Sequence, residues 1–250
     1  MGLEDKIRWQ SAAIMLGVIF IIGVLNIKFL TWLFFGVLAF FAIEEAKKLF
    51  KIESENDLIV VAVSWVAAYL FYEPILLIFL ILLVMAAKLA YDKSIEPKAF
   101  LPIIYPYASI LFMWSLYLND GVKVLIWLLI IVALSDVGAY YSGKKFGKTK
   151  FSETSPNKTL EGVFGGVALS TIVGAILIST TSDINFFVAI LVTLLTSVAS
   201  IFGDLFESYL KREAGVKDSG DLIPGHGGIL DRIDGYLFAS VMLYILLNLE

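Results

Sequence analysis

Nine apolar stretches, separated by short polar breaks, run through this 250-residue sequence. A helix needs about 20 mostly apolar residues to cross the hydrocarbon core of a bilayer, and most of the stretches are close to that length. The pattern therefore predicts an all-α, polytopic integral membrane protein with about nine transmembrane helices. The expected spans are 8–26, 28–46, 57–72, 74–91, 98–118, 121–143, 160–180, 184–212 and 231–249.

Composition supports a lipid environment. Hydrophobic residues make up 59% of the chain and charged residues only 17%, whereas an ordinary soluble domain is roughly 45–50% apolar and about 25% charged. One soluble core could not hide this much apolar side chain. The sequence contains no cysteine, which excludes disulfides and thiolate metal sites.

Positively charged residues predict the orientation. With nine spans, all but two of the 19 Lys and Arg residues fall on the side that holds the N-terminus, and only Lys28 and Lys123 fall on the other. Because loops rich in Lys and Arg stay in the cytoplasm, we expect a cytoplasmic N-terminus and an extracytoplasmic C-terminus.

Polar chemistry is concentrated in the second half of the chain. The two long breaks on the cytoplasmic side, 144–159 and 213–230, are rich in Gly, Lys, Ser and Asp. We therefore expect residues 1–95 (spans 1–4) to form a transmembrane scaffold and residues 96–250 (spans 5–9) to form a catalytic region. The break EEAKKLFKIESEND, after the second span, is interpreted as a solvated turn.

Two acidic positions lie unusually deep in apolar segments. Asp204 directly follows FFVAILVTLLTSVASIFG. Its helix face is shared by Glu207, Ser208 and Lys211, at spacings of three, four and seven. Asp136 lies within IWLLIIVALSDVGAYYSG. A carboxylate at such a depth is costly unless it faces protein, water or a cation. A functional role is favoured for Asp204, while a structural hydrogen bond is an open alternative for Asp136.

A pair of acids opens the last span. Asp231 and Asp234 are three residues apart, so both project from one helical turn, and they repel unless a positive charge lies between them. Mg²⁺ suits such a pair, because it is held by one or two carboxylates together with phosphate oxygens. Capping of the helix N-terminus is the alternative for either acid alone.

The glycine-rich break before this pair is a candidate phosphate site. Glycine lets backbone N–H groups approach an anion, and four basic side chains surround the break: Lys211, Arg212, Lys217 and Arg232. His226, the only histidine, lies within PGHGG, where it could bond a phosphate, transfer a proton or serve structure alone. The break has no Walker A pattern.

The earlier cytoplasmic break ends in SETSPNKTLEG. Asn157 or Thr159 could cap the helix that follows. Lys158 would then lie beside that helix N-terminus, which is a favourable place for an anion. The alternative for Lys158 is one more lysine of the positively charged cytoplasmic side.

The stretch from Ser208 to Asp234, S-Y-L-K-R-E-A-G-V-K-D-S-G-D-L-I-P-G-H-G-G-I-L-D-R-I-D, resembles the signature of the phosphatidate cytidylyltransferases, also called CDP-diacylglycerol synthases. No position departs from the family pattern across these 27 residues. SPNKTLEG resembles the second, shorter motif of the family. The resemblance covers about residues 130–235, and the N-terminal third is similar only in being hydrophobic.

The resemblance implies an activity and a setting. A Mg²⁺-dependent nucleotidyltransferase would convert CTP and phosphatidate to CDP-diacylglycerol and pyrophosphate in phospholipid biosynthesis. Two cation sites are expected, one of which could take a monovalent ion. The resemblance further implies a homodimer in the inner (plasma) membrane, with the active site facing the cytoplasm and with no nucleic-acid partner.

The resemblance also implies roles for single residues. Asp204, Asp231 and Asp234 would be the metal ligands and, with Lys211 and Lys217, the catalytic residues. The substrate-binding residues would be Lys158, Asn157, Ser208, Arg212, His226, Arg232, Asp218 and Asp136.

Three other functions compete with this interpretation. A polyprenol or phytol kinase also combines a nucleotide with a lipid, but the lipid attacks the γ-phosphorus and no pyrophosphate is released. An ion transporter would place polar residues in many spans, and spans 1–5 have almost none. A structural membrane protein leaves the 27-residue polar motif unexplained.

Overall fold

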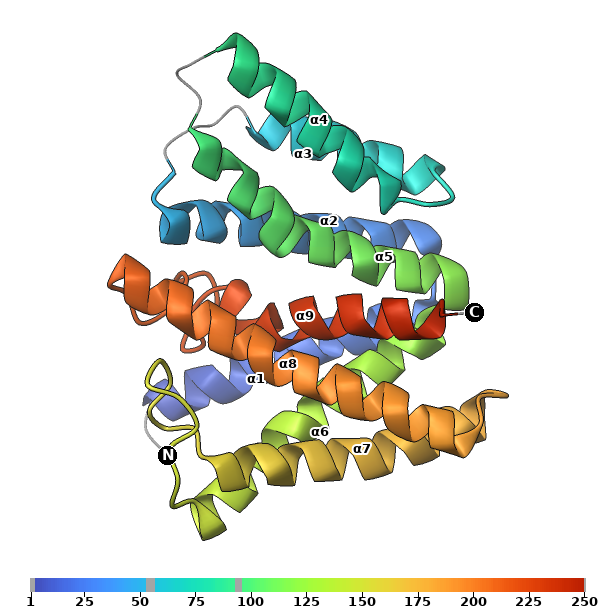
Figure 1. The fold of residues 1–250 in the computed structure, drawn as a ribbon, viewed down its shortest axis with the longest axis vertical. Helices are drawn as coiled ribbons and strands as arrows, with labels where there is room; N and C mark the ends of the chain where they lie inside the picture. The colour runs from blue at the N-terminus through green and yellow to red at the C-terminus, as the bar shows by residue number, and fades with distance from the viewer. Residues whose placement is uncertain (1–2, 53–56, 93–95, 250) are drawn as a thin grey trace. The chain divides into compact units, whose positions relative to one another are not determined.

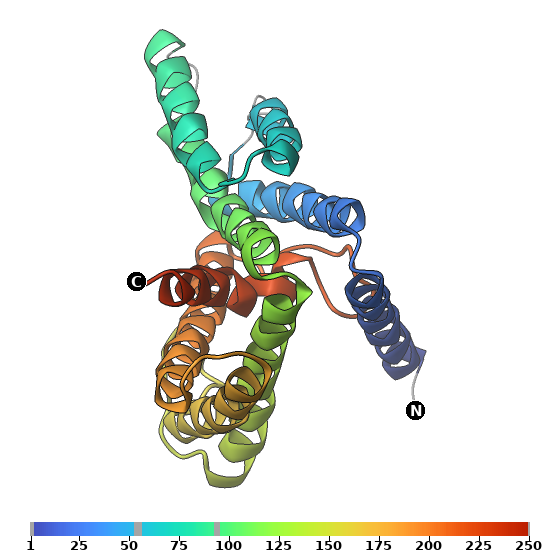
Figure 2. The ribbon, with the colours of Figure 1, turned by 90° about the vertical axis from the view of Figure 1, so that its right-hand side faces the viewer.

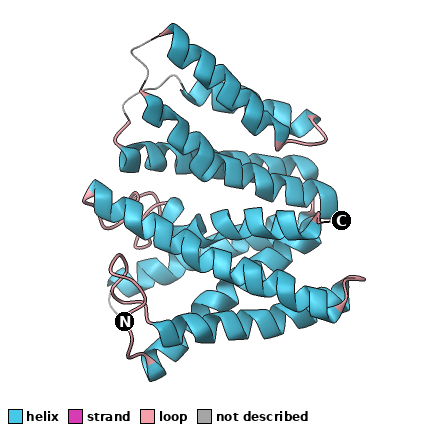
Figure 3. Cartoon of the chain, viewed as in Figure 1, coloured by secondary structure: helices cyan, strands magenta, loops and turns pink. Residues whose placement is uncertain are grey.

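The computed structural model describes residues 3–52, 57–92 and 96–249, which form helices joined by loops (Figures 1 and 3). Within these ranges the chain has nine α-helices and no β-strand beyond isolated bridges. The prediction of an all-α fold is confirmed for this part of the chain. The helices are α1 (Leu3–Leu25), α2 (Lys28–Phe50), α3 (Asp57–Leu70), α4 (Leu76–Tyr91), η1 (Pro97–Phe100), η2 (Ile103–Tyr107), α5 (Ala108–Asp120), α6 (Val122–Phe146), α7 (Leu160–Thr181), α8 (Phe186–Ala214) and α9 (Leu230–Leu247).

Six helical segments of the described chain are long and apolar enough to cross a bilayer. They are α1, α2, the segment Pro97–Asp120, α6, α7 and α8. Large apolar side chains also remain exposed on the helices: Phe20 is 70%, Leu83 68% and Phe187 79% exposed. Both features are consistent with an integral membrane protein. The count of nine crossings and the sides of the termini stay predictions.

The fifth predicted span is not one continuous helix. Tyr105 has an extended backbone (φ −139°, ψ 115°) directly before Pro106, between η1 and α5. Proline has no N–H to donate and disfavours a helical conformation in the residue before it. The apolar pattern predicted the position of the span but not this kink.

The chain divides into two compact units. The first comprises residues 1–118 and 213–232, and the second comprises residues 119–212 and 233–250. The glycine-rich break therefore belongs to the same unit as the N-terminal helices. The expected division between scaffold and catalytic region at residues 95 and 96 stays a prediction.

Aromatic side chains form the core of the first unit. Trp114 is fully buried, and its indole N–H donates to the carbonyl of Ala68 at 2.9 Å. Trp65 stacks on Trp32 with ring centroids 6.4 Å apart and tilts against Trp114 at 6.3 Å. These contacts join α2, α3 and α5, whose apolar faces would otherwise lack partners.

Small residues hold the second unit together. Figures 1 and 2 both show α7 alongside α6 and α8. Gly162 and Gly166 give α7 a G-x-x-x-G face, and a Cβ atom at Gly166 would lie 2.4 Å from the carbonyl oxygen of Ser135 on α6. Such faces let helix backbones approach closely in a membrane. On the other side, the hydroxyl of Ser170 donates to that of Ser197 on α8 at 2.7 Å.

Candidate active site

Eight of the 13 residues predicted to carry chemistry line two cavities, one in each unit. The cavity of the second unit has a volume of about 550 Å³ and lies between α6, α7 and α8. Four predicted residues line it: Asp136, Asn157, Lys158 and Asp204. Tyr140 and Lys144 also line it, and neither was among the predicted site residues. The cavity thus places two acids beside basic and amide groups at the polar ends of three helices.

An ion pair joins the two motifs of this unit. The ammonium of Lys158 contacts Oδ2 of Asp204, although the two residues are 46 positions apart in sequence. The hydroxyl of Ser208 lies 3.4 Å from Oδ1 of the same carboxylate and donates to it. The carboxylate of Asp204 therefore faces protein groups rather than hydrocarbon, as its depth in the apolar segment required.

Lys158 is held in place by the start of α7. Oγ1 of Thr159 accepts from the backbone N–H of Gly162 at 3.1 Å, which confirms one of the two capping candidates. Glu161 accepts from the backbone N–H groups of Lys148 at 3.1 Å and Thr149 at 3.2 Å. These bonds satisfy the free donors of the helix end and of the preceding loop, and they fix the loop that presents Lys158.

Asp234 lies among charged groups of neighbouring helices. Its Oδ1 accepts from the N–H of Gly235 at 2.7 Å, and it interacts electrostatically with Asp204, Asp136 and Lys211. A Cβ atom at Gly203 would lie 2.5 Å from the carbonyl oxygen of Asp234. The glycine therefore lets α8 and α9 approach closely beside the two predicted metal ligands.

Lys211 has a buried partner that the prediction did not assign. Its ammonium lies 2.6 Å from Oε2 of Glu207, whose side chain is fully buried. A buried carboxylate needs such a cation, because desolvation without one is costly. Glu207 therefore contributes to the position of Lys211, which the residues' i, i+4 spacing could have suggested.

The acids of the second unit suit a cation that is completed by a substrate. In the described part of the chain, no group of three or more His, Cys, Asp or Glu side chains is placed to hold a metal ion by itself. Asp204 and Asp234 nevertheless supply hard oxygen donors whose mutual repulsion a cation would relieve. Mg²⁺ needs no more than one or two carboxylates when phosphate oxygens complete its shell. These residues fit a magnesium–phosphate complex.

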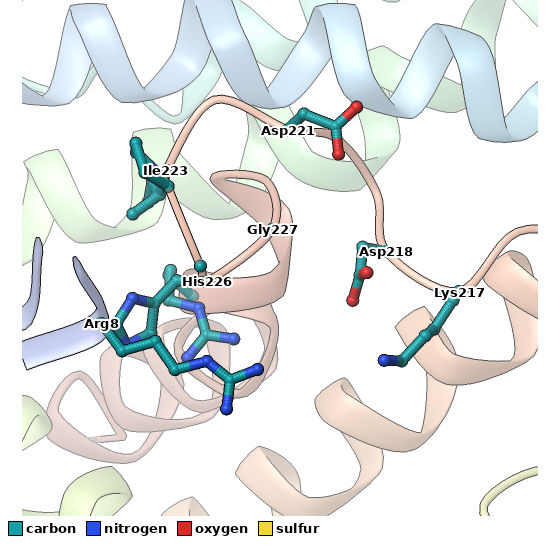
Figure 4. A pocket seen from close by; sticks show the side chains of 10 residues that line it. Arg8, Lys217, Asp218, Asp221, Ile223, His226 and Gly227 are labelled. Carbon is teal, nitrogen blue, oxygen red and sulfur yellow. The ribbon is translucent and has the colours of Figure 1, made fainter. Parts of the chain in front are cut away.

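The cavity of the first unit has a volume of about 560 Å³ and lies in the glycine-rich loop (Figure 4). Four predicted residues line it: Lys217, Asp218, His226 and Arg232. Arg8 of α1 and Asp221 line it as well, and neither was among the predicted site residues. The positive φ angles of Gly225 (76°) and Gly227 (82°) make the tight turn that carries His226, because side chains rarely tolerate that conformation.

Asp231 ties this loop to the start of α9. Its Oδ2 accepts from the N–H of Ser219 at 2.8 Å, the hydroxyl of Ser219 at 2.9 Å and the N–H of Gly228 at 2.8 Å. These bonds match the alternative of a structural role near the helix end. The predicted role of Asp231 as a metal ligand stays a prediction.

The environment of Glu45 on α2 differs most from what the sequence predicted. It is 5% exposed, and its carboxylate accepts from the N–H groups of Ile229 at 2.9 Å and Leu230 at 2.8 Å. It also lies 2.8 Å from the hydroxyl of Ser219. The interpretation of EEAKKLFKIESEND as a solvated turn is therefore wrong for residues 44–50, which continue α2, and above all for Glu45, which caps the first amides of α9. Residues 53–56 of this segment lie outside the described part of the chain.

Ser219 stands between two carboxylates. Its hydroxyl oxygen is 2.8 Å from Oε2 of Glu45 and 2.9 Å from Oδ2 of Asp231. A hydroxyl has one proton, so it donates to one of the two at any moment. The crowding also explains Gly228, because a Cβ atom there would lie 2.4 Å from Oε2 of Glu45.

A periodicity argument could have found Glu45. Ala42, Ala46 and Leu49 are buried on the same face of α2, so Glu45 continues a buried stripe, whereas its neighbour Glu44 does not. Arg8 offers no such signal in the sequence. Five of the predicted residues line neither cavity: Ser208, Lys211, Arg212, Asp231 and Asp234. Of these, Arg212 has an exposed side chain.

Comparison with known proteins gives matches over nearly the whole chain. A family model described as "Cytidylyltransferase family" matches residues 6–250. A phosphatidate cytidylyltransferase of Helicobacter pylori (strain J99) is 39% identical over 245 residues, which cover 98% of this chain and 92% of the relative. One of Bacillus subtilis (strain 168) is 33% identical over 256 residues, covering 95% and 94%. One of Staphylococcus aureus (strain COL) is 46% identical over 131 residues, covering 52% and 50%.

Proposed function

Because this chain belongs to the cytidylyltransferase family, we propose that it transfers the cytidylyl group of CTP to phosphatidate. A phosphate oxygen of phosphatidate attacks the α-phosphorus of CTP. The bond between the α-phosphorus and the bridging oxygen breaks, and pyrophosphate leaves. The products are CDP-diacylglycerol and pyrophosphate.

The ion pair between Lys158 and Asp204 is the observation that supports this proposal most directly. It brings the short motif SPNKTLEG to the helix that carries the start of the long motif. Both reactants are anionic and repel each other, so a transferase of this kind must supply positive charge at the point where they meet. The cavity around this pair combines that charge with carboxylates able to hold a cation.

Basic side chains would bind and orient the phosphates. Lys158 and Lys211 of the second unit, and Lys217 and Arg232 of the first, carry charges suited to phosphate oxygens. The attacking phosphate is already ionised, so little general-base help is needed. The small need for a general base agrees with a chain that has many Lys and Asp residues and only one His.

Asp204 and Asp234, with Asp231 as the third predicted ligand, would hold Mg²⁺. When bound, the ion would neutralise charge on the triphosphate and on the leaving pyrophosphate. A second cation site, including one for a monovalent ion, is part of the proposal and follows from the family resemblance alone.

We place the reaction at the cytoplasmic face of the inner membrane. The acyl chains of phosphatidate stay in lipid while CTP arrives from water, so the reacting groups must meet where the helices end. The excess of Lys and Arg on the predicted cytoplasmic side supports this location. The homodimer follows from the family resemblance and stays a prediction, which chemical cross-linking of the membrane-embedded protein would test.

The position of the radioactive label in CTP provides the decisive experiment. Purified protein in mixed micelles receives phosphatidate, Mg²⁺ and CTP labelled at either the α- or the γ-phosphate. We expect label from the α-phosphate in the lipid product, label from the γ-phosphate in released pyrophosphate, and loss of both with a chelator. Transfer of the γ-phosphate to a polyprenol or other lipid alcohol would identify a kinase and refute the proposal.

A further inference from the structure

The N-terminal end of α1 contacts the loop that carries His226. The hydroxyl of Ser11 donates to the carbonyl of Pro224 at 3.0 Å. Arg8, one turn earlier on the helix, rests against Gly225, where a Cβ atom would lie 2.8 Å from its Cγ. Two successive turns of α1 therefore meet the same turn of the loop, and the second contact requires a glycine.

These contacts bring Arg8 to a cavity with unmatched positive charge. Arg8, Lys217 and Arg232 all line it, and none of the three forms an ion pair with a residue that the structure describes. In the same part of the chain, Nδ1 of His226 is buried and has no hydrogen-bond partner. A buried polar atom without a partner is costly, so a ligand with polar oxygens would complete this group.

The carboxylates of the cavity do not cancel this charge. Asp218 and Asp221 also line it, which leaves an excess of one positive charge. Figure 4 shows Arg8 and His226 on one side of the opening, with Lys217 and Asp218 on the other and Asp221 farther along the loop. The side of the cavity that holds Arg8 is therefore more positively charged than the opposite side.

We propose that Arg8 binds a phosphate group of a substrate in this cavity, together with His226 and Arg232. The proposal rests on the proposed function, which supplies two phosphate-bearing substrates. A guanidinium presents a planar fork of N–H donors that matches phosphate oxygens in a way that a lysine ammonium does not. A volume of about 560 Å³ falls in the range of sites that hold ligands the size of a nucleotide. The phosphate could belong to CTP or to the headgroup of phosphatidate.

Steady-state kinetics with each substrate varied in turn test this proposal. We expect Arg8→Gln to raise the KM for CTP or for phosphatidate by about tenfold, since a charge-assisted bond is lost, with a smaller change in kcat. Arg8→Lys keeps the charge but not the fork and should recover only part of the loss. The substrate whose KM rises identifies the source of the phosphate.

Lys6 provides the matched control, because it lies on the same helix and does not line the cavity. Lys6→Gln should leave both KM values unchanged. Equal effects of Lys6→Gln and Arg8→Gln would attribute the change to general surface charge and overturn the proposal, as would unchanged KM values in Arg8→Gln.

Direct binding separates this inference from the proposed function. CTP and phosphatidate-containing micelles are each titrated against the wild-type protein and Arg8→Gln, with dissociation constants as the readout. Weaker binding of either ligand by the variant supports the site even if the wild-type protein forms no lipid product, which would count against the proposed function alone. Equal binding of both ligands by the two proteins would refute the site.

Discussion

At the scale of single residues, Asp231 has an observed structural role and a proposed role as a metal ligand, and the two make different demands. Its Oδ2 is already used by Ser219 and Gly228, which shapes the loop. A metal ligand, in contrast, needs negative charge rather than a particular hydrogen-bond geometry. Substitution by asparagine separates these demands, because the amide oxygen can still accept the backbone N–H groups while the charge is lost.

We expect Asp231→Asn to remain folded and to lose turnover by about 100-fold or more, as when a transition-state charge partner is removed. The kcat and the thermal unfolding midpoint of the purified variant would be measured side by side. Asp183→Asn, at an exposed position in the loop before α8, is the control and should behave like the wild-type protein. Near-normal turnover in Asp231→Asn would leave this aspartate with a structural role only.

At the scale of elements, α2 supplies the cap that α9 lacks. The residue before α9 is Ile229, whose side chain cannot accept a hydrogen bond, so the first amides of the helix need another partner. Glu45 provides it from 184 and 185 positions away in the sequence. A helix of the predicted scaffold thus fixes the end of the loop that carries His226.

Removal of this cap should destabilise the protein. We expect Glu45→Ala to lower the free energy of unfolding by about 2 kcal/mol, because buried backbone donors lose their acceptor, and to reduce kcat/KM as the loop loses its position. Glu45→Gln keeps an acceptor oxygen and should lose less. Thermal unfolding in detergent and turnover measure the two effects.

Glu44→Gln is the matched control for these variants. Glu44 is the neighbouring carboxylate on α2, is partly exposed and pairs with Lys47 at 3.5 Å. Glutamine keeps an oxygen that can accept a hydrogen bond from that ammonium group. If Glu45→Ala were as stable and active as Glu44→Gln, the cap would have no energetic importance.

At the scale of the whole molecule, the sequence predicted the features that depend on local residue patterns, namely the helices and the residues of the two motifs. Apolar runs placed every long helix. The motif from Ser208 to Asp234 selected residues that line the cavity of the first unit, and the motif SPNKTLEG selected residues that line the cavity of the second. The buried stripe on α2 could have indicated the burial of Glu45, but the contacts of Glu45 with α9 and of Arg8 with the glycine-rich loop join positions far apart in sequence, where no spacing rule applies. The kink at Tyr105 was not predicted, because the spacing of apolar residues carries no information about the effect of Pro106 on the backbone.

The number of crossings depends on the shorter helices. α3 has 14 residues and α4 has 16, so at 1.5 Å per residue they extend only about 21 and 24 Å, less than the hydrocarbon thickness of about 30 Å. If both failed to cross, the termini would keep their predicted sides, since the loss of two spans preserves parity. A test therefore needs reporters at two positions.

We expect a reporter fused after α9 and one inserted in the turn between α3 and α4 both to be extracytoplasmic. Activity of paired reporters, one active only outside and one only in the cytoplasm, would be compared for each fusion. A cytoplasmic C-terminus would exclude nine spans. A cytoplasmic turn with an extracytoplasmic C-terminus would support seven spans, with α3 and α4 outside the membrane core.

The contact between Lys158 and Asp204 has a consequence for the resting protein. Lys158 is the counter-ion of Asp204. This carboxylate, which follows an apolar segment, is therefore paired even without a bound cation. Under the proposed function, a cation bound at Asp204 would replace Lys158, and the released ammonium group could then bind an arriving phosphate. Binding of the cation and binding of the anionic substrate would then be coupled through one side chain.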